Sequence, residues 1–323
     1  MTWLLTGGAG YIGAHIVRVL RDAGKDVAVI DDMTSGVRDR VPADVPLVEA
    51  SVLDTDAVRR AIREHRVTGV VHLAAKKAVG ESMEQPLVYY RENVGGMESL
   101  LRAMVEEGVS RMVFSSSAAV YGIPGVELVD EKTAPHPISP YGETKLVCEW
   151  LLAAAGRAHG ISWIAQRYFN PVGCADATLG DTSVANLVPL SFRALDDGGA
   201  PKIFGDDYPT ADGTCIRDYI HVVDLAGAHV AAAERLETQQ CGDIYNVGRG
   251  EGVSVRQVLD VVGRITGRDF EPEVVGRRAG DPPAYFADPS AIERDLGWRA
   301  ERGLDEMVQS AWDAWQTART PSR

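Results

Sequence analysis

The feature that most constrains the fold is a glycine-rich turn near the amino terminus. The apolar run "WLLT" at 3–6 is followed by "GGAGYIG", with glycines at positions 7, 10 and 13, and an amphipathic stretch at 11–23 comes next. Glycines let the backbone turn tightly and approach a pyrophosphate, while the helix start offers free N–H groups and the positive end of its dipole. This order of strand, turn and helix predicts a dinucleotide-binding site.

The rest of the first half repeats the alternation of strand and helix. Short apolar runs rich in Val, Ile and Leu recur at 27–31, 47–51, 70–74, 112–116 and 163–169. Helical stretches lie between them, near 54–65, 86–107 and 141–159. Nearly unbroken apolar runs are typical of parallel strands that are buried on both faces. Right-handed strand–helix–strand units then predict an α/β fold with a Rossmann-type, doubly wound parallel sheet.

The pattern loosens after about residue 170, where Gly and Pro cluster. Helix-start signals continue there. Ser254 with Gln257 fits a capping box, and Asp288 before Pro289 fits an N-cap followed by the first helical residue. We therefore expect a dinucleotide-binding domain over 1–169 and a smaller C-terminal α/β substrate lobe over 170–323. Some later segments are expected to return to the first domain.

Composition limits the partners and the compartment. The net charge is −13, and an acidic surface repels nucleic acid and anionic membranes. The four cysteines and seven histidines show no metal-binding or redox spacing, so we expect reduced thiols and no metal site. We find no signal peptide and no apolar stretch near the roughly 20 residues that span a bilayer. We expect a cytoplasmic protein without nucleic-acid or membrane partners.

An aspartate at the end of the second apolar run indicates which dinucleotide binds. Asp31 follows the glycine turn at the distance of about 20 residues at which an acidic residue meets the ribose. A carboxylate there accepts hydrogen bonds from ribose hydroxyls and repels a 2′-phosphate. The position therefore predicts NAD rather than NADP, and the neighbouring Asp32 adds negative charge.

A tyrosine and a lysine one helical turn apart indicate acid–base chemistry. In "SPYGETK" (139–145), Ser139 and Pro140 fit the N-cap and first residue of a helix, and Tyr141 and Lys145 then share one face. A free phenol has a pKa near 10 and is a poor base at neutral pH. A nearby ammonium and a positive nicotinamide ring would lower that pKa. The pair predicts a general base that takes a proton from an alcohol.

A run of serines supports a catalytic site at this place. "FSSSAAVYG" (114–122) ends the fifth apolar run, and ligands bind at the carboxyl ends of strands in such sheets. Ser115, Ser116 and Ser117 are polar residues at that edge, where one hydroxyl could bond the reacting oxygen. Taken with the glycine turn and the Tyr–Lys pair, the serines favour an active site over a chance pair on a surface helix.

These residues resemble the extended short-chain dehydrogenase/reductase family, and within it the sugar-nucleotide 4-epimerases, over nearly the whole chain. The matching stretches are "TGGAGYIGAH", "KAVGES", "FSSSAAVYG", "SPYGETK", "RYFNPVG", "IFGDDYPTADGTCIRDYIHVVDLA", "YNVG" and "GDPPAYFAD". The resemblance implies an NAD-dependent enzyme that interconverts UDP-galactose and UDP-glucose at C4, through a transient 4-keto sugar and NADH. It also implies a homodimer, for which the helices near 86–107 and 141–159 are candidates.

The resemblance assigns roles to individual residues. Tyr141 is implied to be the base, Lys145 its pKa partner and Ser117 the hydroxyl that bonds the substrate. The residues implied to bind NAD are Gly7, Gly10, Tyr11, Ile12, Gly13, Asp31, Ser51, Val52, Leu73, Ala74, Lys77, Asn93, Ser115, Tyr141, Lys145 and Tyr168. Those implied to bind the UDP-sugar are Lys77, Ser117, Tyr141, Phe169, Asn170, Asn186, Leu187, Ile203, Phe204, Arg217, Tyr219, Arg278, Asp281 and Tyr285.

The chain departs from the family pattern at a few positions. Ser51 stands where the family usually has an aspartate that bonds the adenine, so adenine contacts are expected to be weaker. Gly95 stands where an asparagine is usual, and the segment between Asn170 and Asn186 is shorter than in the best-known members. None of these changes removes a group implied to be catalytic.

Other functions on this framework stay open. Sugar-nucleotide dehydratases and decarboxylases usually carry an acidic residue just after the serines, and Ala118 and Ala119 argue against both. An epimerase of acetamido or pentose UDP-sugars is an alternative, although the bulky Tyr285 is expected to exclude an acetamido group. A non-catalytic dinucleotide-binding protein is a further alternative, yet the chain keeps both Tyr141 and Lys145.

Overall fold

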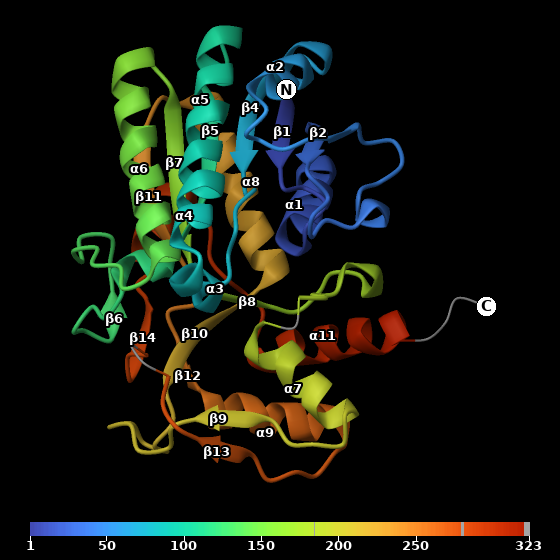
Figure 1. The fold of residues 1–323 in the computed structure, drawn as a ribbon, viewed down its shortest axis with the longest axis vertical. Coiled ribbons are helices and arrows are strands. Elements are labelled where there is room, and N and C mark those ends of the chain that lie inside the picture. The colour runs from blue at the N-terminus through green and yellow to red at the C-terminus, as the bar shows by residue number, and fades with distance from the viewer. Residues whose placement is uncertain (184, 279–280, 320–323) are drawn as a thin grey trace.

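The first lobe is built on one parallel sheet, in a computed structural model that describes residues 1–183, 185–278 and 281–319 (Figure 1). Seven strands lie in the order β11-β7-β5-β4-β1-β2-β3, and every pair is parallel. Their bounds are β1 Thr2–Thr6, β2 Asp26–Asp31, β3 Leu47–Glu49, β4 Val67–His72, β5 Arg111–Ser117, β7 Ser162–Tyr168 and β11 Gly242–Val247. The strand order reverses direction at β1 and β4, so the predicted doubly wound parallel sheet is confirmed.

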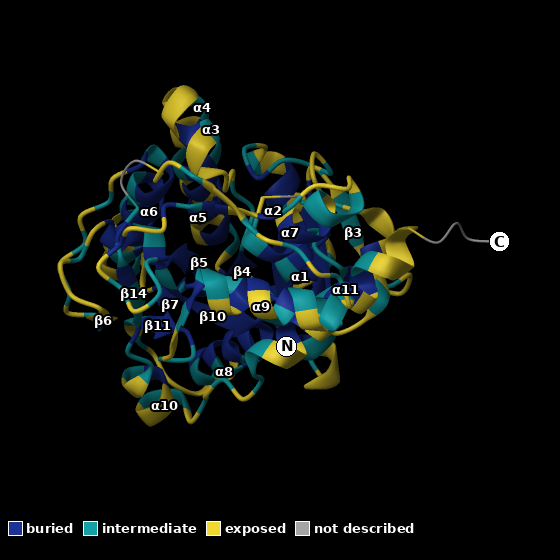
Figure 2. Ribbon diagram, turned by 90° about the horizontal axis from the view of Figure 1, so that it is seen from below, coloured by how far each residue is buried: buried dark blue, intermediate teal, exposed yellow. Residues whose placement is uncertain are grey.

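Helices cover both faces of this sheet because successive strand residues point to opposite sides. Trp3 and Leu5 of β1 pack toward α1 (Tyr11–Asp22) and α8 (Val222–Thr238). Leu4 packs on the other face, which is covered by α2 (Thr55–Glu64), α5 (Gly96–Glu107) and α6 (Pro140–His159). Figure 2 shows the strands as a buried centre surrounded by partly exposed helices.

The helix predicted near 86–107 is broken into three parts. After α3 (Val79–Glu84), which the sequence did not indicate, come α4 (Pro86–Tyr89), a π-helical turn (Tyr90–Gly95) and then α5. The wide turn directs Asn93 inward, where its Oδ1 accepts from Lys76 N (2.8 Å) and its Nδ2 donates to Thr144 Oγ1 (3.0 Å). These bonds give a tertiary reason for the wide turn, and such turns are frequent near functional sites.

The second lobe is built around β10 (Ile216–His221). Its neighbours are β8 (Asn170–Val172), β12 (Gly252–Ser254) and β14 (Ala284–Ala287), and β14 pairs with β6 (Leu128–Val129). Two further strands, β9 (Lys202–Phe204) and β13 (Glu273–Val275), pair with each other. The helices of this lobe are α7 (Leu187–Asp196), α9 (Val255–Thr266) and α11 (Leu304–Arg319), and α10 (Ser290–Leu296) lies beside β11.

The chain crosses between the lobes more than once. Strand β6 comes from the first half of the chain but pairs in the second lobe, whereas α8 and β11 come from the second half and join the first. The boundary at residue 169 therefore stays a prediction. None of the described helices is long and apolar enough to cross a bilayer.

Two of the three predicted helix starts are confirmed. Ser139 Oγ accepts from Gly142 N at the start of α6 (3.2 Å), and Ser254 and Gln257 form a reciprocal capping box on α9. The prediction for α10 is wrong by one residue, since Pro289 is the N-cap and the helix begins at Ser290. Asp288 Oδ1 accepts from Ser290 N (2.9 Å), so its side chain closes a turn before the helix instead of capping it.

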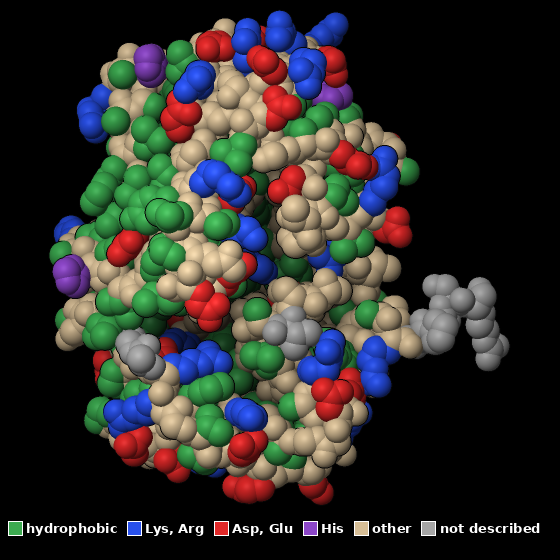
Figure 3. Space-filling model, in the orientation of Figure 1, with side chains coloured by type: hydrophobic (Ala, Val, Ile, Leu, Met, Phe, Trp, Pro, Cys, Tyr) green, Lys and Arg blue, Asp and Glu red, His purple; other side chains and the backbone are tan. Residues whose placement is uncertain are grey.

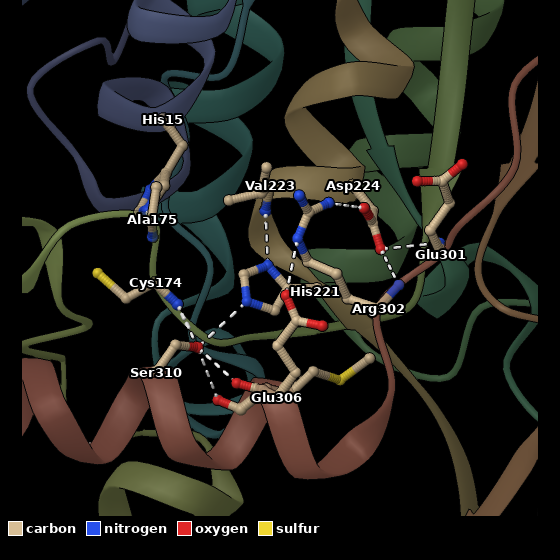
Figure 4. Close-up of polar contacts among 11 residues, drawn as sticks. His15, Cys174, Ala175, His221, Val223, Asp224, Glu301, Arg302, Glu306 and Ser310 are labelled. Carbon is tan, nitrogen blue, oxygen red and sulfur yellow. Dashed lines mark hydrogen bonds and ion pairs between the residues drawn. The ribbon is translucent and has the colours of Figure 1, made fainter.

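A buried histidine of α1 holds the loop that leads from β8 into the second lobe (Figure 4). His15 Nδ1 donates to the carbonyl of Tyr11 (2.8 Å), which leaves Nε2 to accept from Ala175 N (3.1 Å). The Tyr11 hydroxyl donates to the carbonyl of Gly173 in the same loop (2.6 Å). Burial lowers the pKa of His15 to about 4, so the imidazole is neutral, as this pair of bonds requires.

Ser310 of α11 holds the same loop from the other side. Its hydroxyl accepts from Cys174 N (3.1 Å) and bonds His221 Nε2 (3.1 Å). His221 Nδ1 accepts from Val223 N (3.1 Å), so Nε2 is the protonated nitrogen that donates to the serine. Residues 173–176, which we call the clamped loop, are thus fixed between a helix of each lobe.

The start of α11 is attached to α8 through one carboxylate. Asp224, 5% exposed, accepts from the backbone N–H groups of Glu301 (3.1 Å) and Arg302 (2.9 Å) and pairs with the Arg302 guanidinium. We predict that Asp224→Ala lowers the free energy of unfolding by roughly 2–4 kcal/mol, because two N–H groups and a cation lose their acceptor. Urea denaturation measures this.

The matched control for that substitution is Asp313→Ala. Asp313 is exposed and accepts from Gln309 of its own helix, so its removal is expected to change the free energy of unfolding by less than about 0.5 kcal/mol. Equal effects of the two substitutions would contradict the role given to Asp224.

Candidate active site

The glycine-rich turn forms a close-packed cradle between β1 and α1. Gly7 has φ +72°, and a Cβ there would lie 2.9 Å from Ala74 N. A Cβ on Gly13 would lie 2.2 Å from the carbonyl oxygen of Gly7. The N-cap of α1, Gly10, makes no side-chain cap bond, and no acidic residue occupies the first turn of this helix, which is described in full. The turn therefore keeps N–H groups available for an anion.

Asp31 lies at the carboxyl end of β2 and is tied to the same turn. Its Oδ2 accepts from Ala9 N (2.9 Å), and its Oδ1 accepts from Met33 N (3.0 Å). Burial raises the pKa of Asp31, and these two N–H bonds oppose the rise. A carboxylate oxygen can accept more than one hydrogen bond, so a ribose hydroxyl could still bond here.

The residues predicted to bind a dinucleotide gather around this cradle. They lie on α1, in the π-helical turn, on α6 and at the carboxyl ends of the sheet strands, as Gly7, Gly10, Tyr11, Ile12, Gly13, Asp31, Ser51, Val52, Leu73, Ala74, Lys77, Asn93, Ser115, Tyr141, Lys145 and Tyr168. Asn93 is 2% exposed, and both ends of its amide are engaged within the protein. Its role toward a dinucleotide stays a prediction.

Two of the departures from the family pattern, Ser51 and Gly95, meet at one leucine. Leu53 N donates to Ser51 Oγ (3.2 Å), and a Cβ on Gly95 would lie 3.3 Å from Leu53 Cδ2. A side chain larger than glycine at position 95 would require Leu53 to move. The hydroxyl of Ser51 accepts this bond within its own turn, and the expectation of weaker contacts at the adenine end stays a prediction.

Tyr141 and Ser117 meet where β5 ends and α6 begins. Both are buried, and the Ser117 hydroxyl lies close enough to the Tyr141 phenol to influence its pKa. Burial raises the pKa of Tyr141, the Ser117 hydroxyl lowers it, and the nearby Tyr285 raises it further. The Ser117 hydroxyl also accepts from Ala119 N (3.2 Å), which fixes its position. A phenol and a hydroxyl are thus held together at the carboxyl edge of the sheet.

Lys145 does not act on Tyr141 in the way the sequence predicted. Its Nζ donates to the carbonyl of Ser115 (2.8 Å) and lies 5.9 Å from the centroid of the Tyr141 ring. Burial lowers the pKa of Lys145 to about 8. In this arrangement burial of the phenol raises the pKa of Tyr141, and the ammonium is bonded to Ser115. The predicted lowering, which includes the positive nicotinamide ring of bound NAD, stays a prediction.

A buried ion pair lies directly behind these residues. Arg167 of β7 donates to both carboxylate oxygens of Glu149 (2.9 and 2.6 Å), and Ser116 Oγ donates to the same carboxylate (2.5 Å). Arg167 also donates to the Tyr121 hydroxyl (3.0 Å), which donates to Asn246 Oδ1 of β11 (2.7 Å). We call this set the anchor network. It joins the end of β5 to α6, β7 and β11.

Sequence reasoning missed the anchor network, although the chain carries two signals for it. Arg167 is a charged residue inside an otherwise apolar run, and a charge buried in a sheet needs a partner. Glu149 lies four residues after Lys145, on the same helical face. Neither signal says which acid pairs with which base.

The second lobe places an arginine and two aromatic rings opposite Tyr141. The rings of Phe169 and Tyr285 lie 5.6 Å apart, and the Arg217 guanidinium lies 5.2 Å from the Tyr285 ring. Arg217 donates to Asp281 Oδ1 (2.6 Å) and to the carbonyl of Ile216 (2.7 Å). The guanidinium N–H groups of Arg217 are thus already hydrogen-bonded, so an anion that binds Arg217 must replace these acceptors.

The remaining residues predicted to hold a substrate lie after β4, on β8, at the start of α7, on β9 and β10, and after β13. They are Lys77, Asn170, Asn186, Leu187, Ile203, Phe204, Tyr219 and Arg278. Arg278 stacks 3.8 Å above the Phe204 ring, whereas Ile203 is only 1% exposed and offers a ligand little beyond its backbone. Figure 3 shows the surface hollowed where the lobes meet, with Lys and Arg side chains along the hollow. Among the described residues, no group of three or more His, Cys, Asp or Glu could hold a metal ion.

Comparison with known proteins gives consistent matches over the whole chain. A family model described as the NAD dependent epimerase/dehydratase family matches residues 3–248. The chain is 44% identical to a UDP-glucose 4-epimerase of Azospirillum brasilense over 313 residues, which cover 95% of this chain and 90% of that protein.

Two solved structures extend the comparison to the fold. The crystal structure of UDP-glucose 4-epimerase from Brucella ovis in complex with NAD has a TM-score of 0.92 at 40% identity, and covers 96% of this chain and 97% of that chain. The UDP-Glc/GlcNAc 4-epimerase of Campylobacter jejuni has a TM-score of 0.86 at 35% identity. The match covers 98% of this chain and 99% of that chain. Both similarities include the second lobe.

Proposed function

The chain belongs to the NAD dependent epimerase/dehydratase family, and we propose that it is the epimerase that interconverts UDP-galactose and UDP-glucose at C4. One observation carries the proposal. The Tyr141 phenol and the Ser117 hydroxyl are neighbours at the carboxyl edge of the sheet, and the next positions, Ala118 and Ala119, hold no acid that could move a second proton. A site with one proton-transferring group fits inversion at a carbon that bears a hydroxyl.

The glycine cradle fits NAD. Only glycine is tolerated at positions 7 and 13, and Asp31 lies where a ribose would meet it. When bound, NAD supplies a reversible acceptor for the hydride of C4. We propose that the residues expected from the sequence to bind NAD and the substrate do so. Lys145 and Ser115 would lie beside the nicotinamide end of NAD.

Tyr141 moves the proton of the reaction. Tyr141 acts as the phenolate, a form that the positive nicotinamide ring of bound NAD would favour. The phenolate oxygen takes the proton from the 4-hydroxyl of the sugar and returns it after the sugar has turned its other face to the site. Ser117 bonds the reacting oxygen and holds it near the phenol. Both side chains are buried, which keeps bulk water away from the proton.

The arginines of the second lobe hold the UDP portion while the sugar turns. A planar guanidinium pairs well with phosphate oxygens. Arg217 would exchange its bond to Asp281 for the diphosphate, and Arg278 lies over Phe204 on the same side. Because the net redox change is zero, NAD is proposed to stay bound between turnovers.

The first test supplies UDP-galactose to the purified enzyme without added NAD. The wild type is expected to give UDP-glucose at a fixed equilibrium ratio, whereas Tyr141→Phe is expected to lose at least roughly 100-fold in turnover, because the proton acceptor is gone. The NAD content should be unchanged. Resolution of the product sugars by chromatography measures the turnover.

The matched control is Tyr245→Phe, whose hydroxyl contacts Asp295 away from the site. It is expected to keep full turnover. Unchanged turnover in Tyr141→Phe would overturn the assignment of the base. No product from the wild type, with or without added NAD, would favour the non-catalytic alternative.

A second candidate function is epimerisation of UDP-sugars that carry an acetamido group, as the name of the Campylobacter jejuni enzyme indicates for that protein. Tyr285 argues against it, since its ring fills the space between Phe169 and Arg217.

Substitution at Tyr285 tests the size of the sugar pocket. We predict that Tyr285→Cys raises turnover of UDP-N-acetylglucosamine at least roughly tenfold, because the smaller side chain leaves room for the acetamido group. Tyr285→Phe, which keeps the ring, should gain nothing. Efficient turnover of that sugar by the wild type, or no gain in Tyr285→Cys, would contradict this role.

We further propose a homodimer. Apolar side chains of α3, α4 and α6 are exposed, with Met83 60%, Leu87 84% and Trp150 62% exposed. These helices pack beside one another. We propose that the three side chains belong to one apolar patch, and such patches mark interaction sites. The proposed compartment is the cytoplasm, which the four free cysteines support.

Charges in this patch should separate the subunits. We predict that Leu87→Asp combined with Trp150→Glu changes the mass measured by light scattering from that of a dimer to that of a monomer, because a buried charge opposes association. Ile123→Asp is the control, since Ile123 is an exposed apolar residue outside the patch. A wild type that is already monomeric would overturn the proposal.

A further inference from the structure

We propose that Tyr208 binds the substrate, with its phenol hydroxyl as a donor to an oxygen of the nucleoside diphosphate; this rests on the proposed function. Tyr208 lies in the loop between β9 and β10 and is 5% exposed. Within the described residues, only three buried side-chain polar atoms have no hydrogen-bond partner, namely Gln166 Oε1, Arg235 Nε and the Tyr208 hydroxyl. The first two belong to β7 and α8 in the first lobe, so Tyr208 is the unpartnered group of the second lobe.

The ring of Tyr208 is held in place. The Arg277 guanidinium stacks 4.1 Å above it, and the backbone N–H of Tyr208 donates to the carbonyl of Gly213 (2.9 Å). Gly205 has φ +88°, and a Cβ there would lie 3.0 Å from Tyr208 Cε2 and 2.4 Å from Arg277 Cγ. A ring fixed on these sides also fixes the position of its hydroxyl.

The charges around the hydroxyl belong to the proposed diphosphate site. Burial raises the pKa of Tyr208, Asp281 and Cys215 raise it further, and Arg277 and Arg217 lower it. The hydroxyl thus lies in the field of the same Arg217–Asp281 pair that a diphosphate would separate.

Buried hydroxyl groups are normally hydrogen-bonded, and an unpartnered one near a binding site requires an explanation. A ligand that supplies an acceptor would satisfy the phenol only in the bound state. The contribution of Tyr208 would then appear entirely in binding and not in the stability of the free enzyme.

The test is UDP binding to the enzyme as purified, measured by calorimetry for the wild type, Tyr208→Phe and Tyr245→Phe. We expect Tyr208→Phe to weaken UDP binding by about tenfold, as loss of a hydrogen bond to a charged oxygen should. Its KM for UDP-galactose should rise equally, with kcat within about twofold of the wild type. Tyr245→Phe should bind UDP like the wild type.

Thermal unfolding separates this role from a structural one. Tyr208→Phe should have the melting temperature of the wild type without ligand and a smaller increase on addition of UDP. A lower melting temperature without ligand, together with unchanged UDP affinity, would show that the hydroxyl has a partner inside the protein and would overturn the inference. UMP serves as a second probe, because its affinity should fall in Tyr208→Phe only when the bonded oxygen lies on the ribose or the first phosphate.

Failure of this inference is distinguishable from failure of the proposed function. A wild type that binds UDP as tightly as Tyr208→Phe does would overturn the role of Tyr208 alone. A wild type that binds no UDP and converts no UDP-galactose would overturn the proposed function, and the inference with it.

Discussion

The geometry of the site depends on the ion pair between Glu149 and Arg167. Both side chains are 3% exposed, so two charges are held without water, which is tolerable only when every bond is well made. The pair joins α6 to β7, and Ser116 connects it to β5. Ser117 follows Ser116 on β5, and Tyr141 is carried by α6, the same helix as Glu149. A shift of the pair would therefore move the proposed base relative to the serine.

Much of the first lobe could be predicted from the sequence, because its information is local. The glycine turn, the apolar runs and the cap at Ser139 each depend on residues that are close together in the chain. The order of these signals along the chain predicts the parallel sheet. The break in the helix at 90–95 could not be predicted, since it depends on Asn93 meeting Lys76 and Thr144 from other segments. The error at Asp288 has a similar origin, because an aspartate before a proline can cap a helix or close a turn, and the neighbouring chain decides between them.

The candidate site shows the same division between local and distant information. The spacing of Tyr141 and Lys145 indicates a shared face, and the structure places both at the end of β5. The direction of the Tyr141 pKa could not be derived from that spacing, since it depends on burial by the second lobe and on the carbonyl that the lysine bonds. Likewise, the pairing of Arg217 with Asp281 joins residues that are far apart in the chain. A diphosphate that binds at the proposed site would have to displace the Asp281 carboxylate from Arg217.

The clamped loop has a consequence for how such a chain can change during evolution. His15 and Ser310 bond the backbone N–H groups of Ala175 and Cys174, and Tyr11 bonds the carbonyl of Gly173. Main-chain groups are the same in every residue except proline, so the exposed side chain at 175 can change while the lobes keep their mutual orientation. Cys174 is more restricted, because its side chain is buried in a small core cluster with Ala14 and Ala314. Gly173 is restricted as well, because it has φ +95° and a Cβ there would lie 2.6 Å from His221 Nε2. The connection between the two lobes thus depends on Gly173 and on side chains that lie far from the clamped loop in the sequence. A comparison of related sequences restricted to the loop would miss most of the residues that hold it in place.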